Sequence, residues 1–281
     1  MRKTWVIAVV TVGLLVSCKD KKLENAYDTQ TDVQQDSVEA FVGDTLHLFD
    51  EEEPPVAVDE LFDDFFYSFM DDARFQGQRI TYPLPCKQGD NDEEQLSKAD
   101  WTKYNHFENQ EVLSVIYERE QDYELSKDTS MQHVGVEWIR LTDGHVERFN
   151  FNRVGGKWML TGIDKNHHDN MPNRDFLNFY AHFMADTAFQ RASLAEPLKV
   201  VITSEDGEDE PEVDELNADE WTEMLSSIPL PRETMVNVDY GQACISTNRK
   251  TLLLQGISNG MQMKFQFYKD SDGWKLKEIE Y

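Results

Sequence analysis

Two stretches of the chain place aromatic and other apolar residues at the spacing of a single helix face. In residues 62–70, Phe or Met occupies positions i, i+3, i+4, i+7 and i+8, which share one face of a 3.6-residue period. Residues 176–184 repeat this spacing with Phe, Tyr and Met. Burying so many rings gives a large hydrophobic gain, so we predict two core-packing helices rather than ligand sites. His182 lies off the apolar face and is expected in solvent.

Short β-rich segments separated by turn residues follow each predicted helix. Asp143-Gly144, Asn259-Gly260 and Asp272-Gly273 supply the positive φ angles that tight hairpins need. The predicted strands are 134–141, 146–153, 157–163, 251–258, 261–268 and 274–281, with an earlier strand at 112–119 and at 236–245. The segments around Trp101 and Trp221 are expected to form a short helix or turn. A helix followed by an antiparallel meander predicts an α+β fold, with the helix packed on one face of a curved sheet.

The two halves of this pattern also align in sequence. At a constant offset of 114, residues 62–84 and 176–198 share nine identities in 23 positions, against roughly one or two expected from average composition. Later identities keep the same order, among them Trp101/Trp221, Phe149/Phe265 and Trp158/Trp274. We therefore predict two tandem copies of one α+β unit, at residues 56–165 and 172–281, joined by a polar linker at 166–171.

Composition sets limits on partners. With 40% hydrophobic and 11% aromatic residues, the chain can build a core and is not a disordered acidic segment. Its 27 basic and 54 acidic residues give a net charge of −27. A nucleic-acid binder needs basic patches to meet phosphates, so the charge argues against that class. It also argues against docking on anionic lipid through charge.

The N-terminal residues are typical of a secretion signal. Arg2 and Lys3 precede an apolar run from Trp5 to Val16, which is too short to span a bilayer comfortably but fits a signal peptide. The run ends in Leu15-Val16-Ser17-Cys18, which resembles a bacterial lipobox. We expect cleavage of residues 1–17 between Ser17 and Cys18, with lipid (including palmitate) attached to Cys18. A buried apolar helix with an incidental cysteine is the alternative.

Residues 18–55 are expected to form the lipidated cysteine and an acidic flexible tether. They are rich in Asp, Glu, Gln and Lys and end in Glu51-Glu52-Glu53-Pro54-Pro55, although a weak apolar patch near 41–49 could dock on the folded part instead. By resemblance to enteric lipoproteins, Lys19 after the cysteine gives no signal for inner-membrane retention. The expected location is the outer membrane of a Gram-negative bacterium, and the sequence leaves open whether the protein faces the periplasm or the outside.

The folded part resembles a known family. The aromatic first helix, the antiparallel strands, and last strands reading Gly-Lys-Trp-Met-Leu (156–160) and Gly-Trp-Lys-Leu (273–276) resemble the nuclear transport factor two-like (cystatin-like) fold. With the lipobox and tether, the whole chain is similar to Bacteroides-type lipoproteins that carry a domain of unknown function. The resemblance covers most of residues 56–281 and implies a sheet curled around each helix. Relatives use the resulting conical pocket for isomerase or dehydratase chemistry, use it for small-ligand binding, or fill it with side chains.

Candidate sites outside Cys18 are weak. Cys86 and Cys244 could form a disulfide between the copies, but two separate, partly buried thiols are the favoured interpretation. His167-His168-Asp169-Asn170 is interpreted as polar linker, because adjacent histidines on a strand point apart and no third ligand follows at a recognised spacing. The acidic segment 205–215 and the Asp-rich turn 270–273 are interpreted as solvated loops. No metal and no cofactor is predicted.

No motif of nucleophilic, phosphate-binding or zinc chemistry is present in the sequence. Acid–base candidates are Asp64, Tyr117, Glu137 and Tyr240, but their spacing selects no pair, so no catalytic residue is assigned. The favoured hypothesis is a non-enzymatic module of the cell envelope that binds a small apolar or glycan-like molecule or another envelope protein. The alternatives are an isomerase- or dehydratase-like enzyme that uses a conical pocket, and a structural spacer with filled cones.

Overall fold

The computed structural model describes residues 56–89, 92–103, 107, 110–204, 210–245, 248–257 and 259–281. The predicted signal peptide, Cys18, the tether and acidic residues 205–209 lie outside the described residues. The described residues, from 56 onward, form one compact unit. Within the ranges given above, no helix combines the length and the apolar character needed to cross a membrane.

Both predicted aromatic helices form. They are α1 (Phe62–Asp71) and α5 (Arg174–Ala185), and each is followed after one residue by a short helix, α2 (Ala73–Gln78) or α6 (Thr187–Ala192). The separating residue is an aspartate, Asp72 or Asp186, whose carboxylate accepts hydrogen bonds from two backbone N–H groups of the next helix. An N-cap of this kind satisfies donors that a helix start leaves open, so each aspartate begins a new helix.

The remaining elements follow the same order in both halves, except that α4 and η2 occur in the first half alone among the described residues. The first half has η1 (Val56–Asp59), β1 (Leu84–Gln88), β2 (Asp92–Leu96), α3 (Lys98–Trp101), β3 (Val112–Tyr117), α4 (Glu120–Tyr123), η2 (Glu124–Lys127), β4 (His133–Arg140), β5 (His145–Val154) and β6 (Lys157–His167). The second has η3 (His168–Asn170), β7 (Leu194–Ile202), β8 (Glu212–Leu216), α7 (Ala218–Leu225), β9 (Thr234–Asp239), β10 (Arg249–Gly256), β11 (Gln262–Asp270) and β12 (Gly273–Glu280). The sequence analysis did not predict β1, β2, β7 and β8. The interpretation of segment 205–215 as a loop was wrong for residues 212–215, which belong to β8.

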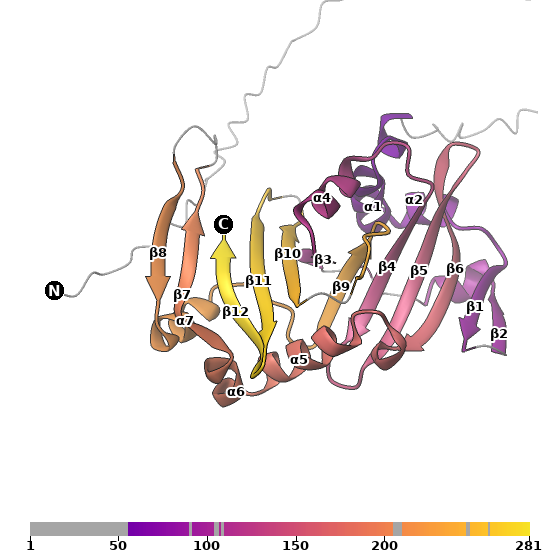
Figure 1. The fold of residues 1–281 in the computed structure, drawn as a ribbon. Coiled ribbons are helices and arrows are strands. Elements are labelled where there is room, and N and C mark those ends of the chain that lie inside the picture. Colours follow the sequence, from indigo (N-terminus) through magenta and orange to yellow (C-terminus); the bar gives the residue numbers. More distant parts are fainter. Residues whose placement is uncertain are drawn as a thin grey trace, which may run out of the picture. The chain divides into compact units, whose positions relative to one another are not determined.

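The twelve strands of the described residues belong to one sheet, in the order β2-β1-β6-β5-β4-β9-β3-β10-β11-β12-β7-β8 (Figure 1). The expectation of one antiparallel sheet for each copy was therefore wrong. The sheet is mixed, because β1 runs parallel to β6, β7 runs parallel to β12, and β3 runs parallel to β9. The first two parallel pairs arise because the chain crosses over to place its first strand beside its last within each half.

The two halves exchange their middle strands at the centre of the sheet. β4 pairs with β9 of the second half rather than with β3, and β3 pairs with β10 of the second half. β3 and β9 then meet side by side at Ser114 and Asn237. The Ser114 hydroxyl donates to the Val236 carbonyl at 2.9 Å, and the Ile116 N–H donates to Asn237 Oδ1 at 3.1 Å. Each half is thus completed by a strand of the other.

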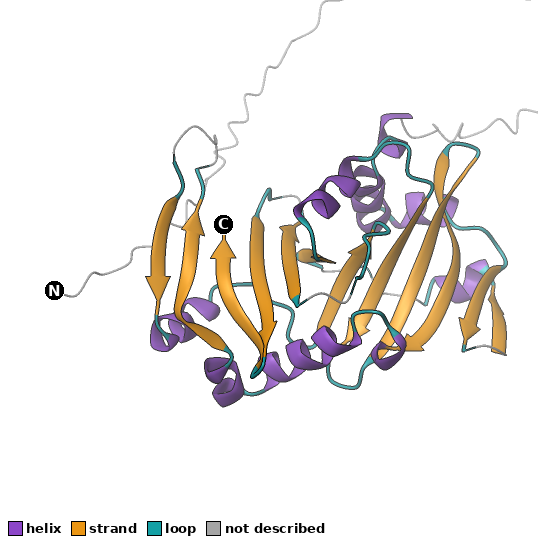
Figure 2. Cartoon of the chain, in the orientation of Figure 1, coloured by secondary structure: helices purple, strands orange, loops and turns teal. Residues whose placement is uncertain are grey.

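Two hydrophobic cores lie on opposite faces of this sheet. Successive side chains of a strand point to opposite faces. On β3, Val115 belongs to the core under α1 and Ile116 to the core under α5. On β10, Leu253 belongs to the core under α1 and Leu252 to the core under α5. The helices of the first half therefore cover one face and those of the second half cover the other, and the two groups lie apart in Figure 2.

Aromatic rings fill the space between helix and sheet in both halves. In the first, the Phe69 and Phe151 ring centroids are 5.2 Å apart; in the second, those of Phe183 and Phe267 are 5.8 Å apart. The fully buried aromatic side chains include Phe65, Phe66, Phe69, Phe149, Phe151, Trp158, Phe176, Phe183, Trp221 and Phe265. The conical pockets that the resemblance implies are occupied by these side chains.

A repeated hydrogen bond fixes each short helix against its tryptophan. The Trp101 indole N–H donates to Gln76 Oε1 at 2.8 Å, and the Trp221 indole N–H donates to Gln190 Oε1 at 3.3 Å. A buried indole N–H is usually hydrogen-bonded, because leaving it without a partner costs free energy. The identity of glutamine at positions 76 and 190 therefore has a structural reason in both halves.

Candidate functional site

Two of the four acid–base candidates named from the sequence line one cavity, and Asp64 and Tyr240 are not among its lining residues. Asp64 is exposed, whereas its neighbour Asp63 accepts a short hydrogen bond from the Tyr240 hydroxyl. Burial raises the pKa of Asp63 to about 6 and raises the pKa of Tyr240 well above 10. Tyr117 is buried in the first core. Of these candidates, Glu137 and Tyr117 line a cavity.

Two adjoining cavities lie on the face of the sheet opposite α1. They measure about 610 Å³ and about 160 Å³, and both are lined by Glu137, Arg148, Met171 and Pro172. Ile116 lines the smaller cavity and Val146 lines the larger one, and both side chains belong to the core under α5. The cavities therefore occupy the junction of the halves, where the chain leaves β6 and enters α5.

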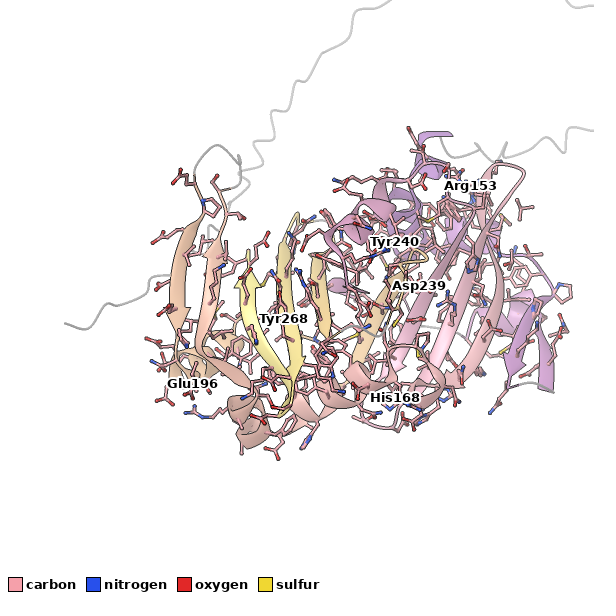
Figure 3. The ribbon with its side chains drawn as sticks, in the orientation of Figure 1. Arg153, His168, Glu196, Asp239, Tyr240 and Tyr268 are labelled. Atoms are coloured by element: carbon pink, nitrogen blue, oxygen red, sulfur yellow. The ribbon has the colours of Figure 1, made fainter. Side chains whose placement is uncertain are left out.

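An ion triad from both halves forms the floor between the cavities. Arg148 Nη1 lies 2.6 Å from Glu137 Oε1, and its Nη2 lies 2.7 Å from Asp239 Oδ2. The Asn237 side-chain amide donates to the other Glu137 oxygen at 2.8 Å. Burial raises the pKa of Glu137, and the Arg148 charge opposes this effect. Figure 3 labels Asp239, the member of the triad at the end of β9.

Gly135 on β4 makes room for this triad. A Cβ atom at this position would lie 2.3 Å from the guanidinium carbon of Arg148. Because this distance is far below van der Waals contact, any side chain here would displace the arginine. The glycine thus lets a charged group lie flat on the strand.

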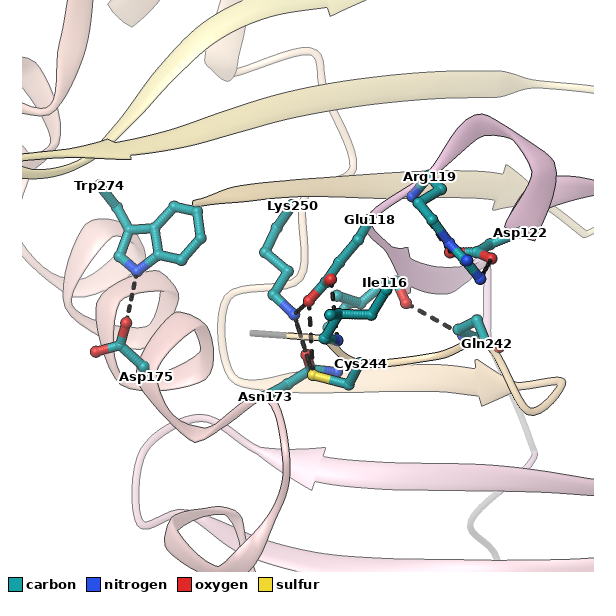
Figure 4. Close-up of polar contacts among 11 residues, drawn as sticks. Ile116, Glu118, Arg119, Asp122, Asn173, Asp175, Gln242, Cys244, Lys250 and Trp274 are labelled. Atoms are coloured by element: carbon teal, nitrogen blue, oxygen red, sulfur yellow. Dashed lines mark hydrogen bonds and ion pairs between the residues drawn. The ribbon is translucent and has the colours of Figure 1, made fainter. Parts of the chain in front are cut away.

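A second buried ion pair closes the smaller cavity (Figure 4). Lys250 Nζ contacts the Glu118 carboxylate, Asn173 Oδ1 at 2.7 Å and Cys244 Sγ at 3.2 Å. Glu118 also accepts a hydrogen bond of 3.0 Å from the Ile245 N–H. The side chains of Lys250 and Glu118 are 5% and 1% exposed. Such pairs are costly to bury unless their hydrogen bonds are satisfied, as they are here.

Cys86 and Cys244 are both free thiols in the structure, so the disulfide considered from the sequence is not formed. Cys86 lies on β1 and Cys244 follows β9, with β6, β5 and β4 between these strands. Four strand spacings amount to roughly 19 Å, whereas bridged Cα atoms lie within about 7 Å of each other. Cys86 is buried in the first core, and Cys244 lies in the Lys250 cluster.

The linker segment forms part of the cavity wall. Asn166, Asn170 and Met171 line the larger cavity. The sequence analysis expected His167 and His168 to point apart, but their ring centroids lie 4.8 Å from each other. The strand ends at His167 and a 3-10 turn begins at His168, so the alternation of an extended strand no longer applies. Burial lowers the pKa of His168, which Figure 3 labels on this turn.

Sequence reasoning missed Glu118, Arg148, Asn173 and Lys250. These residues lie on separate elements, and Glu118 and Lys250 are 132 positions apart in the chain. A usable signal was the presence of charged residues inside otherwise apolar strand ends, at 118 and 250.

The fold and the comparisons agree on the class of protein. The described part is a mixed α+β structure with one large sheet, and it is similar to an NTF2-like protein from Bacteroides fragilis NCTC 9343 whose crystal structure is known at 2.15 Å resolution. The two share 32% sequence identity with a TM-score of 0.72, over 81% of this chain and 98% of that chain. The sequence profile described as "Domain of unknown function (DUF4348)" matches residues 43–281, and the chain belongs to this family. Among curated proteins, none matches the chain.

Proposed function

We propose that this chain is a lipid-anchored, non-enzymatic binding protein of the Gram-negative cell envelope. In this proposal Cys18 carries the lipid, residues 19–55 form the tether, and the outer membrane is the anchoring surface. The lipobox sequence and the likeness to a Bacteroides protein support the proposal. The shared element order of the two halves supports their origin as tandem copies of one unit.

The binding site in this proposal is the pair of cavities at the junction of the halves. The observation that carries the proposal is an ion pair facing open space. The buried Glu137 carboxylate and the half-buried Arg148 guanidinium line both cavities. Replacing a buried ion pair by apolar residues often leaves stability unchanged or improves it. Charges kept at the floor of a cavity are therefore better explained by a ligand than by folding.

The lining favours a neutral, hydroxyl-rich ligand over an apolar one. Three basic side chains (Lys87, Arg148 and Lys165) face two carboxylates (Glu137 and Asp164) and the amides of Asn166 and Asn170 in the larger cavity. Nearly balanced charge selects neither an anion nor a cation strongly, whereas hydroxyl groups can both donate to and accept from such a wall. Of the ligands considered from the sequence, a glycan-like molecule therefore fits best.

The enzymatic alternative has less support from the fold. It rested on a conical pocket, and the space between helix and sheet is filled by rings such as Phe69 and Phe151. The junction cavities contain acidic and basic groups, but Glu137 and Arg148 are tied to each other at 2.6 Å. The spacer alternative explains the filled cones but leaves the charged cavity without a purpose.

Calorimetric titration of the full chain with a panel of soluble mono- and oligosaccharides tests the proposal. We expect at least one to bind, and we expect Lys87→Ala and Asn170→Ala to weaken its binding about tenfold, since each removes hydrogen bonds to the ligand. Lys98→Ala, at an exposed lysine on α3, is the matched control and should have no effect. Absence of binding across the panel, or equal binding by all three variants, would contradict the proposal.

A further inference from the structure

We propose that His167, His168 and Asp169 form a binding site for a divalent transition-metal ion of the Zn²⁺ class, beside the larger cavity. This site does not depend on the proposed saccharide binding. Its residues end β6 and form the first turn of η3. They contribute two imidazoles and one carboxylate, which is a ligand set that zinc uses when a fourth position is left for water.

The three side chains already converge. Each offers one ligand atom, and these atoms lie within 4.8 Å of one another. His167 Nδ1 lies 3.2 Å from Asp169 Oδ2, and His168 Nε2 lies 3.9 Å from Asp169 Oδ1. Ligand atoms around a tetrahedral Zn²⁺ are about 3.3 Å apart, given bonds of about 2.0–2.2 Å. The His167–Asp169 pair already has this spacing, and no pair of ligand atoms exceeds it by more than about 1.5 Å.

Gly144 shapes the space into which the two imidazoles point. A Cβ atom at this position would lie 2.5 Å from His167 Nε2 and 2.9 Å from His168 Nε2. The glycine has φ +72°, and its carbonyl accepts a 2.8 Å hydrogen bond from the His168 backbone N–H. His167 Nε2 lies 2.9 Å from the Asp143 carbonyl oxygen, so His167 offers Nδ1 to an ion while His168 offers Nε2. Any side chain at position 144 would displace both rings from this arrangement.

A residue of α5 holds the carboxylate in place. The Asn178 side-chain amide donates to Asp169 Oδ1 at 3.2 Å. Hydrogen bonds from neighbouring residues to the ligating side chains orient those side chains in metal sites. The His168 side chain is 8% exposed, so packing fixes its ring before any ion arrives. These contacts distinguish the cluster from surface histidines that meet a metal by chance.

A further histidine stands at the edge of the cluster. His145 on β5 is the direct partner of His167 on β6, and opposite residues of neighbouring strands project their side chains to the same face. Three of the seven histidines of the chain are therefore gathered at this end of the sheet. His145 Nε2 lies 4.0 Å from Glu147 Oε1, so a water molecule is the expected fourth ligand.

Metal binding here would tie the last strand of the first half to the start of α5. Asn166, Asn170 and Met171, which flank the cluster, line the larger cavity. An ion bound only by the folded state stabilises that state by mass action. We therefore expect added Zn²⁺ to raise the unfolding temperature of the chain.

The test is a titration of the full chain with Zn²⁺ by competition with a chromogenic chelator. A large excess of Mg²⁺ keeps the many acidic side chains occupied, since Mg²⁺ prefers oxygen ligands. The variants are His167→Asn and Asp169→Asn. The matched control is His182→Asn, which alters an exposed histidine that also lies near an aspartate, with Nε2 3.8 Å from Asp186 Oδ2.

We expect one tight Zn²⁺ ion per chain, an affinity at least about tenfold lower in His167→Asn and Asp169→Asn, and no change in His182→Asn. The rise in unfolding temperature should disappear with the first two variants and remain with the third. The inference is overturned if no ion binds tightly, or if His182→Asn weakens binding as much as the other two. Circular dichroism of each variant without metal shows whether it is folded. If His167→Asn does not fold, Asp169→Asn, which changes an exposed residue, still tests the inference.

Discussion

Glu118 and Lys250 form a buried ion pair across the junction of the two halves, although 132 positions separate them in the chain. Glu118 directly follows β3, and Lys250 is the second residue of β10. Because β3 pairs with β10 in the exchanged arrangement, the ion pair can form only when the halves are assembled. It therefore links the fold of the sheet to the shape of the smaller cavity.

Breaking this pair on one side should be costly. Glu118→Gln leaves the Lys250 charge buried without its partner, and we expect a loss of about 3–5 kcal/mol in the free energy of unfolding. The double variant Glu118→Leu/Lys250→Met should lose clearly less, since no charge remains buried. Urea unfolding of the wild type and these two variants measures both effects. As a control, Glu124→Gln removes an exposed pair with Lys127 and should change stability by at most about 1 kcal/mol. A loss below that level for Glu118→Gln would contradict the account.

The strand exchange predicts that the two cores unfold together. Phe149 in the first core and Phe265 in the second are both fully buried. Phe149→Ala and Phe265→Ala should each cost about 3–5 kcal/mol. Each should move the same single transition, whether it is followed by far-ultraviolet circular dichroism or by tryptophan fluorescence. Two separate transitions, each shifted by only one of the substitutions, would show instead that the halves are independent.

The two free thiols should differ in reactivity. Cys86 is buried and burial raises the pKa of its thiol, so its reactive thiolate is scarce. Cys244 is partly exposed and should react first with a thiol reagent in the native protein. In a chain carrying Cys18→Ser, unfolding without reductant should release two titratable thiols, and Cys244→Ser should remove the fast phase. Thiols that titrate only after reduction would mean that the pair is oxidised.

Asp63 should make the fold more stable in mild acid. Its pKa rises from 3.8 to about 6 on burial, so the folded state holds the proton more tightly than the unfolded state. Between these values stability falls as the pH rises, by about 3 kcal/mol at most for a shift of about two units. Relative to Asp63→Asn, the wild type should lose stability as the pH increases from about 4 to about 7. Asp71→Asn, at an exposed carboxylate at the end of α1, is the control and should leave the wild-type pH dependence unchanged. A constant difference between wild type and Asp63→Asn would contradict the prediction.

Much of the local structure could be predicted from the sequence. The spacing of aromatic residues predicted both long helices, and the Gly-containing turns predicted the later strands of each half. Both signals lie within short segments of the sequence, so they can be recognised without knowledge of long-range contacts. β2 and β8 carried no such signal: they read Asp-Glu-Glu-Gln-Leu and Glu-Val-Asp-Glu-Leu. Both are edge strands, where charge discourages pairing with other chains, so hydrophobic alternation is weak there.

The exchange of β3 and β9 could not be predicted in the same way. Both are short apolar strands, and each could satisfy its backbone hydrogen bonds beside either half. The choice is made by long-range contacts such as the one between Ser114 and Asn237. The site depends on that choice, since Asp239 meets Arg148 only when β9 lies beside β4.

The central claim is that binding takes place at the junction of the halves and not in the filled cones. Nuclear magnetic resonance of the ¹⁵N-labelled chain with a bound saccharide tests it most directly, because both regions carry side-chain N–H reporters. The account predicts shifts in the amide signals of Asn166 and Asn170, which line the larger cavity, and unchanged indole signals of Trp101 and Trp221, which are buried in the two cores. Shifted indole signals together with unchanged asparagine amide signals would place the ligand between a helix and the sheet and contradict the account.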